Sequence, residues 1–335
     1  MTDKPILSIK DLYVQFNTEE GTVRAVNGVS YDCYKGKTLA VVGESGCGKS
    51  VTAMSILRLI PMPPGQFTGG QIMYEGEDVL KMPDNKMRHI RGNEVAIIFQ
   101  EPMTALNPVY TIGQQIIEAV ELHLGKKGPA ARQHAMDMLV KVGISAPEQR
   151  IDAYPHQLSG GMRQRVMIAM ALCCDPALLI ADEPTTALDV TIQAQILDLI
   201  KDLQNTNGMS VILITHDLAV VAENADDVCV MYASKVVEQT DVHKTFARPL
   251  HPYTKGLLHS LPRMDLKLER LEVIPGSVPN PLHFPTGCKF HPRCPYCKDD
   301  PQCKTQEPIL EEAEKDHWVA CWKTKEIQAE LDKNK

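Results

Sequence analysis

The sequence predicts an α/β fold with a mostly parallel central sheet, and three observations favour this class. Short apolar runs rich in β-branched residues alternate with longer amphipathic runs through residues 1–235. Four of the apolar runs, "TLAVV", "VAIIF", "ALLIAD" and "SVILITH", end at turn or capping residues, as buried parallel strands do. A glycine-rich loop joins the first of these runs to a helical pattern.

The predicted elements follow one another along the chain in a consistent order. The strand at 38–42 leads through the loop into a helix, "VTAMSILRLI", which we expect to stop at Pro61. After the strand at 95–99, apolar residues recur at helical spacing in "TIGQQIIEAVELHL" and "AARQHAMDMLVKVGI", which predicts a helical insertion. After residue 240 proline becomes frequent and periodicity fades, so we expect a separate loop-rich unit there.

The bulk composition limits the classes of protein to consider. With 335 residues, the chain is long enough for two or three compact units at about 150 residues each. No apolar stretch is long enough to span a membrane, and no basic segment followed by an apolar one opens the chain, so we expect a cytosolic protein. A net charge of -7 argues against a nucleic-acid partner.

The glycine-rich loop "GESGCGKS", residues 43–50, has the spacing G-x-x-x-x-G-K-S. In such a loop the backbone amides surround the phosphates of a nucleotide, Lys49 reaches the outer phosphates, and the Ser50 hydroxyl ligates magnesium. The alternative is an ordinary turn, but a strand before the loop and a helix after it favour nucleotide binding. The residues that we expect to contact the nucleotide here are Gly43, Ser45, Gly46, Gly48, Lys49, Ser50 and Val51.

Three further polar residues follow buried strands, where chemistry gathers in open α/β sheets. In "LLIADEP", Asp182 is expected to hold magnesium and Glu183 to orient the attacking water; the alternative is that Asp182 only starts a turn. In "LITHD", His216 is expected to contact a γ-phosphate oxygen, although an isolated histidine there is more often structural.

The stretch "QLSGGMRQRVMIAMALCCDP" predicts a helix start that can accept an outside anion. Ser159 is a natural N-cap, and Gly160 and Gly161 leave the next amides uncovered. Met162 stands where a capping carboxylate would normally come, three residues after the cap.

These segments carry a resemblance. In order, "GESGCGKS", "FQEP", "LSGGMRQR", "LLIADEP", "TALD" and "ITHD" resemble the phosphate loop, Q-loop, signature, Walker B, D-loop and switch histidine of ABC transporter ATPases. The match implies a P-loop NTPase fold, with an ABC nucleotide-binding domain at 1–240, a helical subdomain at about 101–165 and a Pro/Cys-rich accessory domain at 241–335. Finer features, such as "MTALNPVYTIGQQI" and "RPLHPYTKGLLHSLP", resemble the dipeptide, oligopeptide and nickel uptake branch, and within it the dipeptide-permease subunits.

The resemblance implies a head-to-tail dimer in which one subunit's phosphate loop and the other's signature enclose ATP and Mg²⁺. Gln100 would reach the magnesium and the water, and Asp189 would cross the dimer interface. Phe16 is our choice for the aromatic residue that stacks on adenine, with Tyr13 as the second choice. The implied partners are two transmembrane permease subunits, a second related ATP-binding subunit or another copy of this chain, and an extracytoplasmic solute-binding protein. The chain would then lie peripherally at the cytoplasmic face of the cell membrane.

The ten cysteines divide into two groups. Those at 33, 47, 173, 174 and 229 are scattered and are interpreted as small core or loop residues. The others crowd the last 48 residues, where four thiolates would hold zinc or an iron–sulfur cluster and so stabilise a segment short of core. The resembled branch implies a [4Fe–4S] site on Cys288, Cys294, Cys303 and Cys321, with Cys297 as an alternative ligand and Zn²⁺ as the alternative metal.

The function expected from these observations is the ATP-hydrolysing subunit of an importer of dipeptides or short oligopeptides. The same ATPase role for nickel or another small solute is an alternative. A non-transport ABC protein that acts on DNA would need a long coiled coil between the phosphate loop and the signature. It is disfavoured because only roughly 110 residues, without heptads, lie there. A metal-binding regulatory protein is disfavoured because Glu183 and His216 are both present.

Overall fold

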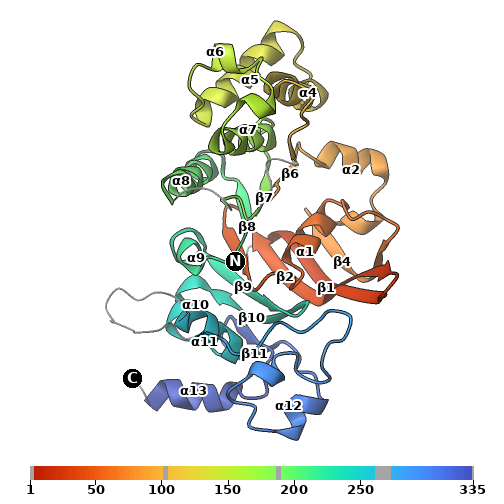
Figure 1. Ribbon diagram of the computed structural model, residues 1–335, viewed down its shortest axis with the longest axis vertical. Helices are drawn as coiled ribbons and strands as arrows, with labels where there is room; N and C mark the ends of the chain where they lie inside the picture. The colour runs from red at the N-terminus through yellow and green to blue at the C-terminus, as the bar shows by residue number, and fades with distance from the viewer. Residues whose placement is uncertain (1–3, 101–104, 186–189, 261–272, 334–335) are drawn as a thin grey trace. The chain divides into compact units, whose positions relative to one another are not determined.

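The computed structural model describes residues 4–100, 105–185, 190–260 and 273–333 (Figure 1). The chain forms two compact units. The first comprises Met1–Ile6, Cys33–Lys37 and Lys81–Ile214, and the second comprises Leu7–Asp32, Thr38–Leu80 and Thr215–Lys335. Among the described residues, no helix has both the length and the apolar character needed to cross a bilayer.

The first unit contains three adjacent parallel strands: β6 (Val95–Ile98), β7 (Leu178–Asp182) and β8 (Ser210–Thr215). β7 lies in the middle, with Ile180 opposite Ile97 on one side and opposite Ile212 on the other. All five residues of β7 are buried, as expected for a parallel strand that is covered on both faces. The predicted strands are therefore present, and their carboxyl ends lie together at one edge of this sheet.

The first unit is helical where the sequence predicted helices after the strand at 95–99, at α4 (Ile112–Leu124) and α5 (Pro129–Lys141). Its other helices are α2 (Asp84–Ile90), α6 (Pro147–Arg150), α7 (Gly160–Leu172) and α8 (Val190–Asn207), with a 3₁₀ turn at Pro155–Gln157. Thr111 starts α4 through a capping box with Gln114, and Gly125 ends it with a φ of 65°. α4, α5 and α7 pack against one another in Figure 1.

The second unit contains two groups of strands. One is an antiparallel sheet in the order β2–β1–β4–β5, formed by β1 (Pro5–Thr18), β2 (Gly21–Tyr34), β4 (Gly65–Tyr74) and β5 (Glu77–Asp78). The other has the order β11–β12–β10–β9–β3, formed by β3 (Thr38–Val42), β9 (Asp227–Tyr232), β10 (Lys235–Asp241), β11 (Glu311–Glu314) and β12 (His317–Val319). Only β3 and β9 in this second group are parallel.

The second unit also contains the helix that follows the glycine-rich loop and the helices of the C-terminal region. These are α1 (Lys49–Ile56), α9 (Leu218–Asn224), α10 (Val242–Ala247), α11 (Pro252–His259), α12 (Pro301–Thr305) and α13 (Thr324–Lys333), with 3₁₀ turns at Val79–Lys81 and His291–Arg293. One core cluster joins strand residues such as Val228 and Val230 to Tyr253 and Phe290 from the C-terminal region. The C-terminal region therefore shares a core with β3 and β9.

Two local predictions were wrong. α1 ends at Ile56 rather than at Pro61, because Arg58 takes a φ of 50° and the Leu59 amide bonds back to the Met54 carbonyl. The segment after residue 240 is also less loop-rich than expected. Its short strand β12 pairs with β10, so pairing with a distant strand supplies the regularity that its own sequence lacks.

Candidate nucleotide site

The loop at 43–50 is shaped by glycines at positive φ. Gly43, Gly46 and Gly48 have φ angles of 152°, 80° and 100°, which side chains rarely allow. A Cβ on Gly43 would lie 2.2 Å from the Met231 carbonyl oxygen, and a Cβ on Gly48 would lie 2.3 Å from the Ala25 carbonyl oxygen. Glycine is therefore required at 43 and 48 both for conformation and for space.

The loop leads directly into α1 and its lysine. Gly48 is the N-cap of α1 and offers no side chain to the first amides, so these can face an anion. The Lys49 side chain is buried, and its Nζ donates to the carbonyls of Gly43 at 2.6 Å and Glu44 at 3.2 Å. The Thr52 hydroxyl donates to the Gly48 carbonyl at 2.8 Å. The ammonium is thus held over the loop, where phosphate oxygens would replace or join these carbonyls.

In the first unit, Gln100 and Glu183 meet across adjacent strand ends. Gln100 follows β6, Glu183 follows β7, and Gln100 Nε2 donates to Glu183 Oε2 at 3.0 Å. Asp182 is buried at the end of β7. Glu183 has a φ of 46°, a conformation that costs energy in a residue with a Cβ and is concentrated at functional sites. The structure therefore brings together the predicted water-orienting pair.

His216 follows β8 directly and is exposed. Its neighbour Asp217 caps α9, because Asp217 Oδ1 accepts from the Ala219 amide at 2.9 Å and from the Val220 amide at 3.4 Å. The Asp217 amide donates to the Thr215 hydroxyl at 3.0 Å. The turn that presents His216 is therefore fixed on both sides by hydrogen bonds.

The signature segment starts α7 as predicted. Ser159 is the N-cap, and its Oγ accepts from the Met162 amide at 3.4 Å, while the first turn of the helix carries no acidic residue. Ser159 and Gly160 are exposed, and a Cβ on Gly160 would meet nothing within 4 Å. The helix tip is thus open to an outside group.

The two arginines of the signature, Arg163 and Arg165, bind neighbouring segments of the first unit. Arg163 Nε donates to the Pro155 carbonyl at 2.8 Å. Arg165 donates to the Val142 carbonyl at 2.5 Å and to Gln195 Oε1 at 2.6 Å. Both side chains bind α7 to neighbouring segments. The polar groups of half-buried side chains are usually hydrogen-bonded, and nearby carbonyls are available here.

The other predicted nucleotide contacts are less defined. Asp189 lies outside the described residues. Phe16 is half-buried on β1, and Tyr13 on the same strand is 39% exposed. The Tyr13 side chain packs over Gly28 and Gly69, where a Cβ would lie 3.0 Å from the Tyr13 hydroxyl oxygen and 3.1 Å from a Tyr13 ring carbon, respectively. The choice between the two aromatic residues stays a prediction.

Comparison with known proteins decides the family. Residues 26–186 match the family model described as "ABC transporter", and residues 237–303 match "Oligopeptide/dipeptide transporter, C-terminal region". The dipeptide transport ATP-binding protein DppD of Bacillus subtilis is 52% identical over 95% of this chain and 94% of its own length. This chain belongs to the ABC transporter family. A probable peptide ABC transporter ATP-binding protein of Sinorhizobium fredii is 50% identical over 96% of both chains, and the DppD of Escherichia coli is 50% identical over 91% of this chain and 92% of its own length.

A solved structure supports the same fold. The dimeric post-hydrolysis structure of an ATP-binding cassette bound to ADP and Pi matches with a TM-score of 0.64 and 25% identity, over 70% of this chain and 98% of that one. The chain therefore has the fold of an ABC ATPase cassette, and ATP is the nucleotide of its family.

The five scattered cysteines agree with their interpretation as small core or loop residues. The scattered cysteines at 33, 47, 173, 174 and 229 are all buried. In the C-terminal region the Cys288 amide donates to the Cys303 carbonyl at 2.9 Å, which closes a loop that carries Cys294 and Cys297. None of the ten is disulfide-bonded. The cysteines of this loop, together with Cys321, form what we term the cysteine cluster: Cys288, Cys294, Cys297, Cys303 and Cys321.

Backbone hydrogen bonds shape the turns of the cysteine cluster. The His291 amide donates to the Cys288 carbonyl at 3.1 Å, and the Cys297 amide donates to the Cys294 carbonyl at 3.3 Å. The Lys323 amide donates to Cys321 Sγ at 3.3 Å. An N–H···S bond of this kind favours the thiolate, which is the form that binds metals.

Burial has the opposite effect on the thiols of the cluster. It raises the pKa of the Cys294 thiol to about 11 and that of the Cys321 thiol to about 12, with a smaller contribution from neighbouring cysteines of the cluster. Within the described ranges, no group of three or more His, Cys, Asp or Glu residues has the geometry of a metal site. The predicted iron–sulfur or zinc centre is thus not established, although the donor chemistry of the cluster suits a group bound by thiolates.

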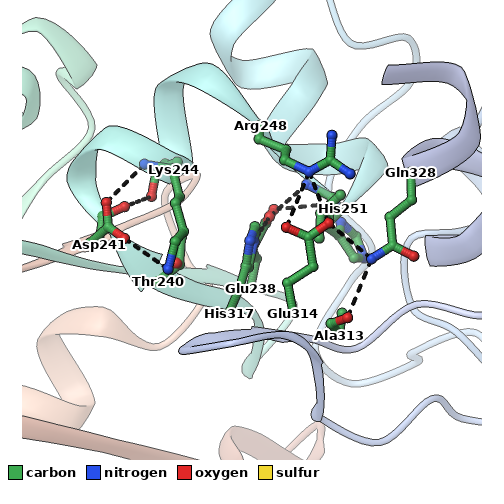
Figure 2. A network of polar contacts seen from close by, with 12 residues as sticks. Glu238, Thr240, Asp241, Lys244, Arg248, His251, Ala313, Glu314, His317 and Gln328 are labelled. Carbon is green, nitrogen blue, oxygen red and sulfur yellow. Dashed lines mark hydrogen bonds and ion pairs between the residues drawn. The ribbon is translucent and has the colours of Figure 1, made fainter. Parts of the chain in front are cut away.

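A buried carboxylate joins the strands to the C-terminal region (Figure 2). Glu238 on β10 is fully buried and accepts from the Leu250 amide at 2.6 Å, the His251 amide at 3.0 Å and His317 Nε2 at 2.7 Å. His251 then caps α11, since its Nδ1 accepts from the Tyr253 amide at 3.0 Å. One acidic side chain thereby fixes both the start of α11 and strand β12.

Sequence reasoning missed residues that hold the site in place. Gln115 on α4 is buried and organises the segment after the Q-loop: its Oε1 accepts from the Asn107 amide at 2.9 Å, and its Nε2 donates to the carbonyls of Asn107 and Tyr110 at 3.0 Å and 3.1 Å. Gln164 on α7 is buried and donates to the Pro184 carbonyl, next to Glu183. A glutamine on an otherwise apolar helix face is the signal that could have pointed to both.

Proposed function

We propose that this chain is the ATP-hydrolysing subunit of an ABC importer that powers uptake of dipeptides or short oligopeptides through a membrane permease. The observation that carries the proposal is a nucleotide loop of ABC type in a chain about half identical, along nearly all its length, to ATP-binding proteins named for peptide transport. The match of residues 237–303 to the C-terminal region of oligopeptide and dipeptide transporters favours peptide over nickel as cargo.

In this proposal each half of the nucleotide site has a task. The loop amides and Lys49 bind the phosphates, and magnesium bound by Ser50, Asp182 and Gln100 would neutralise their charge. Glu183 orients the attacking water, and its bond from Gln100 fixes the direction of its carboxylate before the water arrives. His216 contacts the γ-phosphate and distinguishes ATP from ADP. Phosphoryl transfer needs positioning and charge neutralisation rather than covalent help, and these residues supply both.

The signature of a second subunit completes the site. Ser159 and Gly160 are exposed at the tip of α7, and a Cβ on Gly160 would meet none of the described residues within 4 Å. The amides at this tip, with those of Gly161, would bind the γ-phosphate held by the other subunit's loop, and Asp189 would contact the partner. The partner is a related ATP-binding subunit or a second copy of this chain.

The permease contact is proposed on the helical part of the first unit. Val109 and Tyr110, in the segment that Gln115 organises, are 71% and 52% exposed. Apolar side chains presented by an ordered segment are suited to a protein partner. Because this segment follows Gln100, movement of the glutamine at the nucleotide can be passed to the permease. The chain would then lie peripherally at the cytoplasmic face of the membrane, and an extracytoplasmic binding protein would deliver the peptide.

We retain the two proposed domains, at 1–240 and 241–335, and propose that the cysteine cluster of the second holds a [4Fe–4S] group on Cys288, Cys294, Cys303 and Cys321. What supports it is the gathering of half-buried and buried cysteines near one another, with the Lys323 amide donating to the Cys321 sulfur. Zn²⁺ on four of the five is the alternative. Anaerobically purified protein that is brown, with broad visible absorbance, would identify iron–sulfur, whereas colourless protein with stoichiometric zinc would identify the alternative.

The proposed function is tested by assembly and transport. The chain is purified together with the permease subunits that accompany it, reconstituted in vesicles with the binding protein, and assayed for ATP turnover with and without a dipeptide. We expect the dipeptide to raise turnover and to be taken up, and Val109→Asp to uncouple the two without loss of ATP binding. Stimulation by nickel and not by any peptide would refute the peptide assignment.

A further inference from the structure

The second residue of the phosphate loop, Glu44, is bound through all three of its polar groups. Its amide donates to the Tyr253 hydroxyl at 2.8 Å, and its carbonyl accepts from Lys49 Nζ at 3.2 Å. Its carboxylate accepts from Arg293 at 2.7 Å and 3.1 Å, in a two-pronged pair. Tyr253 and Arg293 both belong to the C-terminal region, so two of the three polar groups of Glu44 tie the loop to that region.

Arg293 is built into place rather than lying on the surface. Its side chain is 5% exposed, against 30% for that of Glu44. Its remaining donor bonds run to the carbonyls of Pro275 at 2.9 Å and Ile274 at 3.4 Å, and to the Tyr232 hydroxyl at 3.4 Å. A guanidinium fixed this way presents a rigid fork to one carboxylate, unlike a surface ion pair, whose contribution is small.

An aromatic cluster fixes the backbone on both sides of this contact. Tyr232, Tyr253 and Phe290 pack together, with ring centroids 4.7 Å, 5.1 Å and 5.5 Å apart. Phe290 lies three residues before Arg293 and Cys294 directly follows it, so the cysteine-bearing turn and the loop anchor are one short segment. This segment therefore contacts the phosphate loop through one side chain, that of Arg293.

The Glu44 carboxylate would weaken phosphate binding by the loop if its negative charge were not compensated. A negative charge near the phosphates repels them unless a cation neutralises it or holds it aside, and Lys49 is already committed to the phosphates. Arg293 does both, since it pairs the charge and sets the direction of the side chain. Because the Glu44 carboxylate is paired with Arg293, it does not compete with the phosphates for the Lys49 ammonium.

We propose that Arg293 is a positioning residue for the phosphate loop, and that through its pair with Glu44 the cysteine-bearing C-terminal region sets the affinity of the chain for nucleotide. The inference rests on the proposed nucleotide role of the loop. It gives the C-terminal region a part in ATP binding in addition to any part in assembly.

The test is a double-mutant cycle on the full-length chain, with ADP and Mg²⁺ as the probe so that no hydrolysis intervenes. Binding is measured by calorimetric titration for the unaltered protein, Arg293→Met, Glu44→Gln and the double variant. We expect Arg293→Met to raise the Kd for ADP about tenfold, because one charge at a partly screened site is left uncompensated. We expect the double variant to bind ADP as Glu44→Gln alone does, because the charge that Arg293 compensates is then absent.

A matched control separates this effect from general loosening of the C-terminal region. Arg248 also pairs with carboxylates there, Glu314 and Asp332, each at 2.8 Å, but it does not bind the loop. Arg248→Met is expected to leave the Kd for ADP unchanged. In steady-state turnover Arg293→Met is expected to raise KM for ATP more than it lowers kcat, and Arg293→Lys to restore part of the affinity.

Two results would overturn the inference. One is an unchanged Kd in Arg293→Met beside an unaltered protein that binds ADP. The other is a double variant that binds no better than Arg293→Met, which would mean that the arginine only supports the fold. If Arg293→Met does not fold, Arg293→Lys with and without Glu44→Gln gives the same comparison. Failure of the unaltered protein to bind nucleotide would instead contradict the proposed function, and this inference with it.

Discussion

Acid is predicted to loosen the C-terminal region through His251. This imidazole is 1% exposed, and burial lowers its pKa from 6.5 to about 4, while the neighbouring Glu238 carboxylate opposes the shift. Between those two pH values the unfolded chain binds a proton that the folded chain does not, so stability falls as the pH falls. The contribution is complete above pH 6.5. Going from neutral pH to pH 5 should cost about 2 kcal/mol, at about 1.4 kcal/mol per pH unit over 1.5 units.

The assay uses the chain's two tryptophans, Trp318 and Trp322, which both lie in the C-terminal region. Urea unfolding is followed by their fluorescence at pH 7.5 and pH 5.0, for the unaltered protein and for His251→Asn. Asparagine keeps an acceptor at the N-cap of α11 but does not titrate. We expect the variant to lose about 2 kcal/mol less than the unaltered protein between the two pH values. Equal losses in both proteins would refute the reasoning.

Three further outcomes are expected. Glu183→Gln should lower ATP turnover by about 10²-fold or more while nucleotide still binds, because the group that orients the water is lost; turnover near that of the unaltered protein would remove Glu183 from its role. Gly48→Ala should abolish ADP binding, since its Cβ would lie 2.3 Å from the Ala25 carbonyl oxygen, whereas Gly46→Ala, at a φ of 80° but with nothing within 4 Å, should keep measurable binding in the same titration. Cys294→Ser should lower the iron or zinc content of anaerobically purified protein, and metal content unchanged from the unaltered protein would exclude that cysteine as a ligand.

The nucleotide loop was predictable because its requirements are local. Three glycines at positive φ, a lysine after the last of them and a strand and helix on either side are all properties of neighbouring residues. The N-cap at Ser159 was predictable for the same reason. The role of Gln100 was implied by the resemblance to ABC ATPases, and its meeting with Glu183 agrees with the rule that the carboxyl ends of adjacent parallel strands share an edge of the sheet.

Other features depended on pairs that no local pattern marks. Glu44 is a charged residue within the predicted loop, but its partner Arg293 lies 249 positions away. The segment that carries Arg293 has no periodicity that would mark it. The carboxylate of Glu238 and the imidazole of His317 meet across 79 positions, on two strands that only the fold makes neighbours.

The sequence by itself thus determined the fold class, the nucleotide loop, the strand ends that carry the polar residues and the family to which the chain belongs. The tertiary structure alone decided that the C-terminal region reaches the phosphate loop, and which side chains make that contact. The physical reason is that backbone conformation and capping depend on residues a few positions apart, whereas burial and charge pairing depend on which distant surfaces the fold brings together.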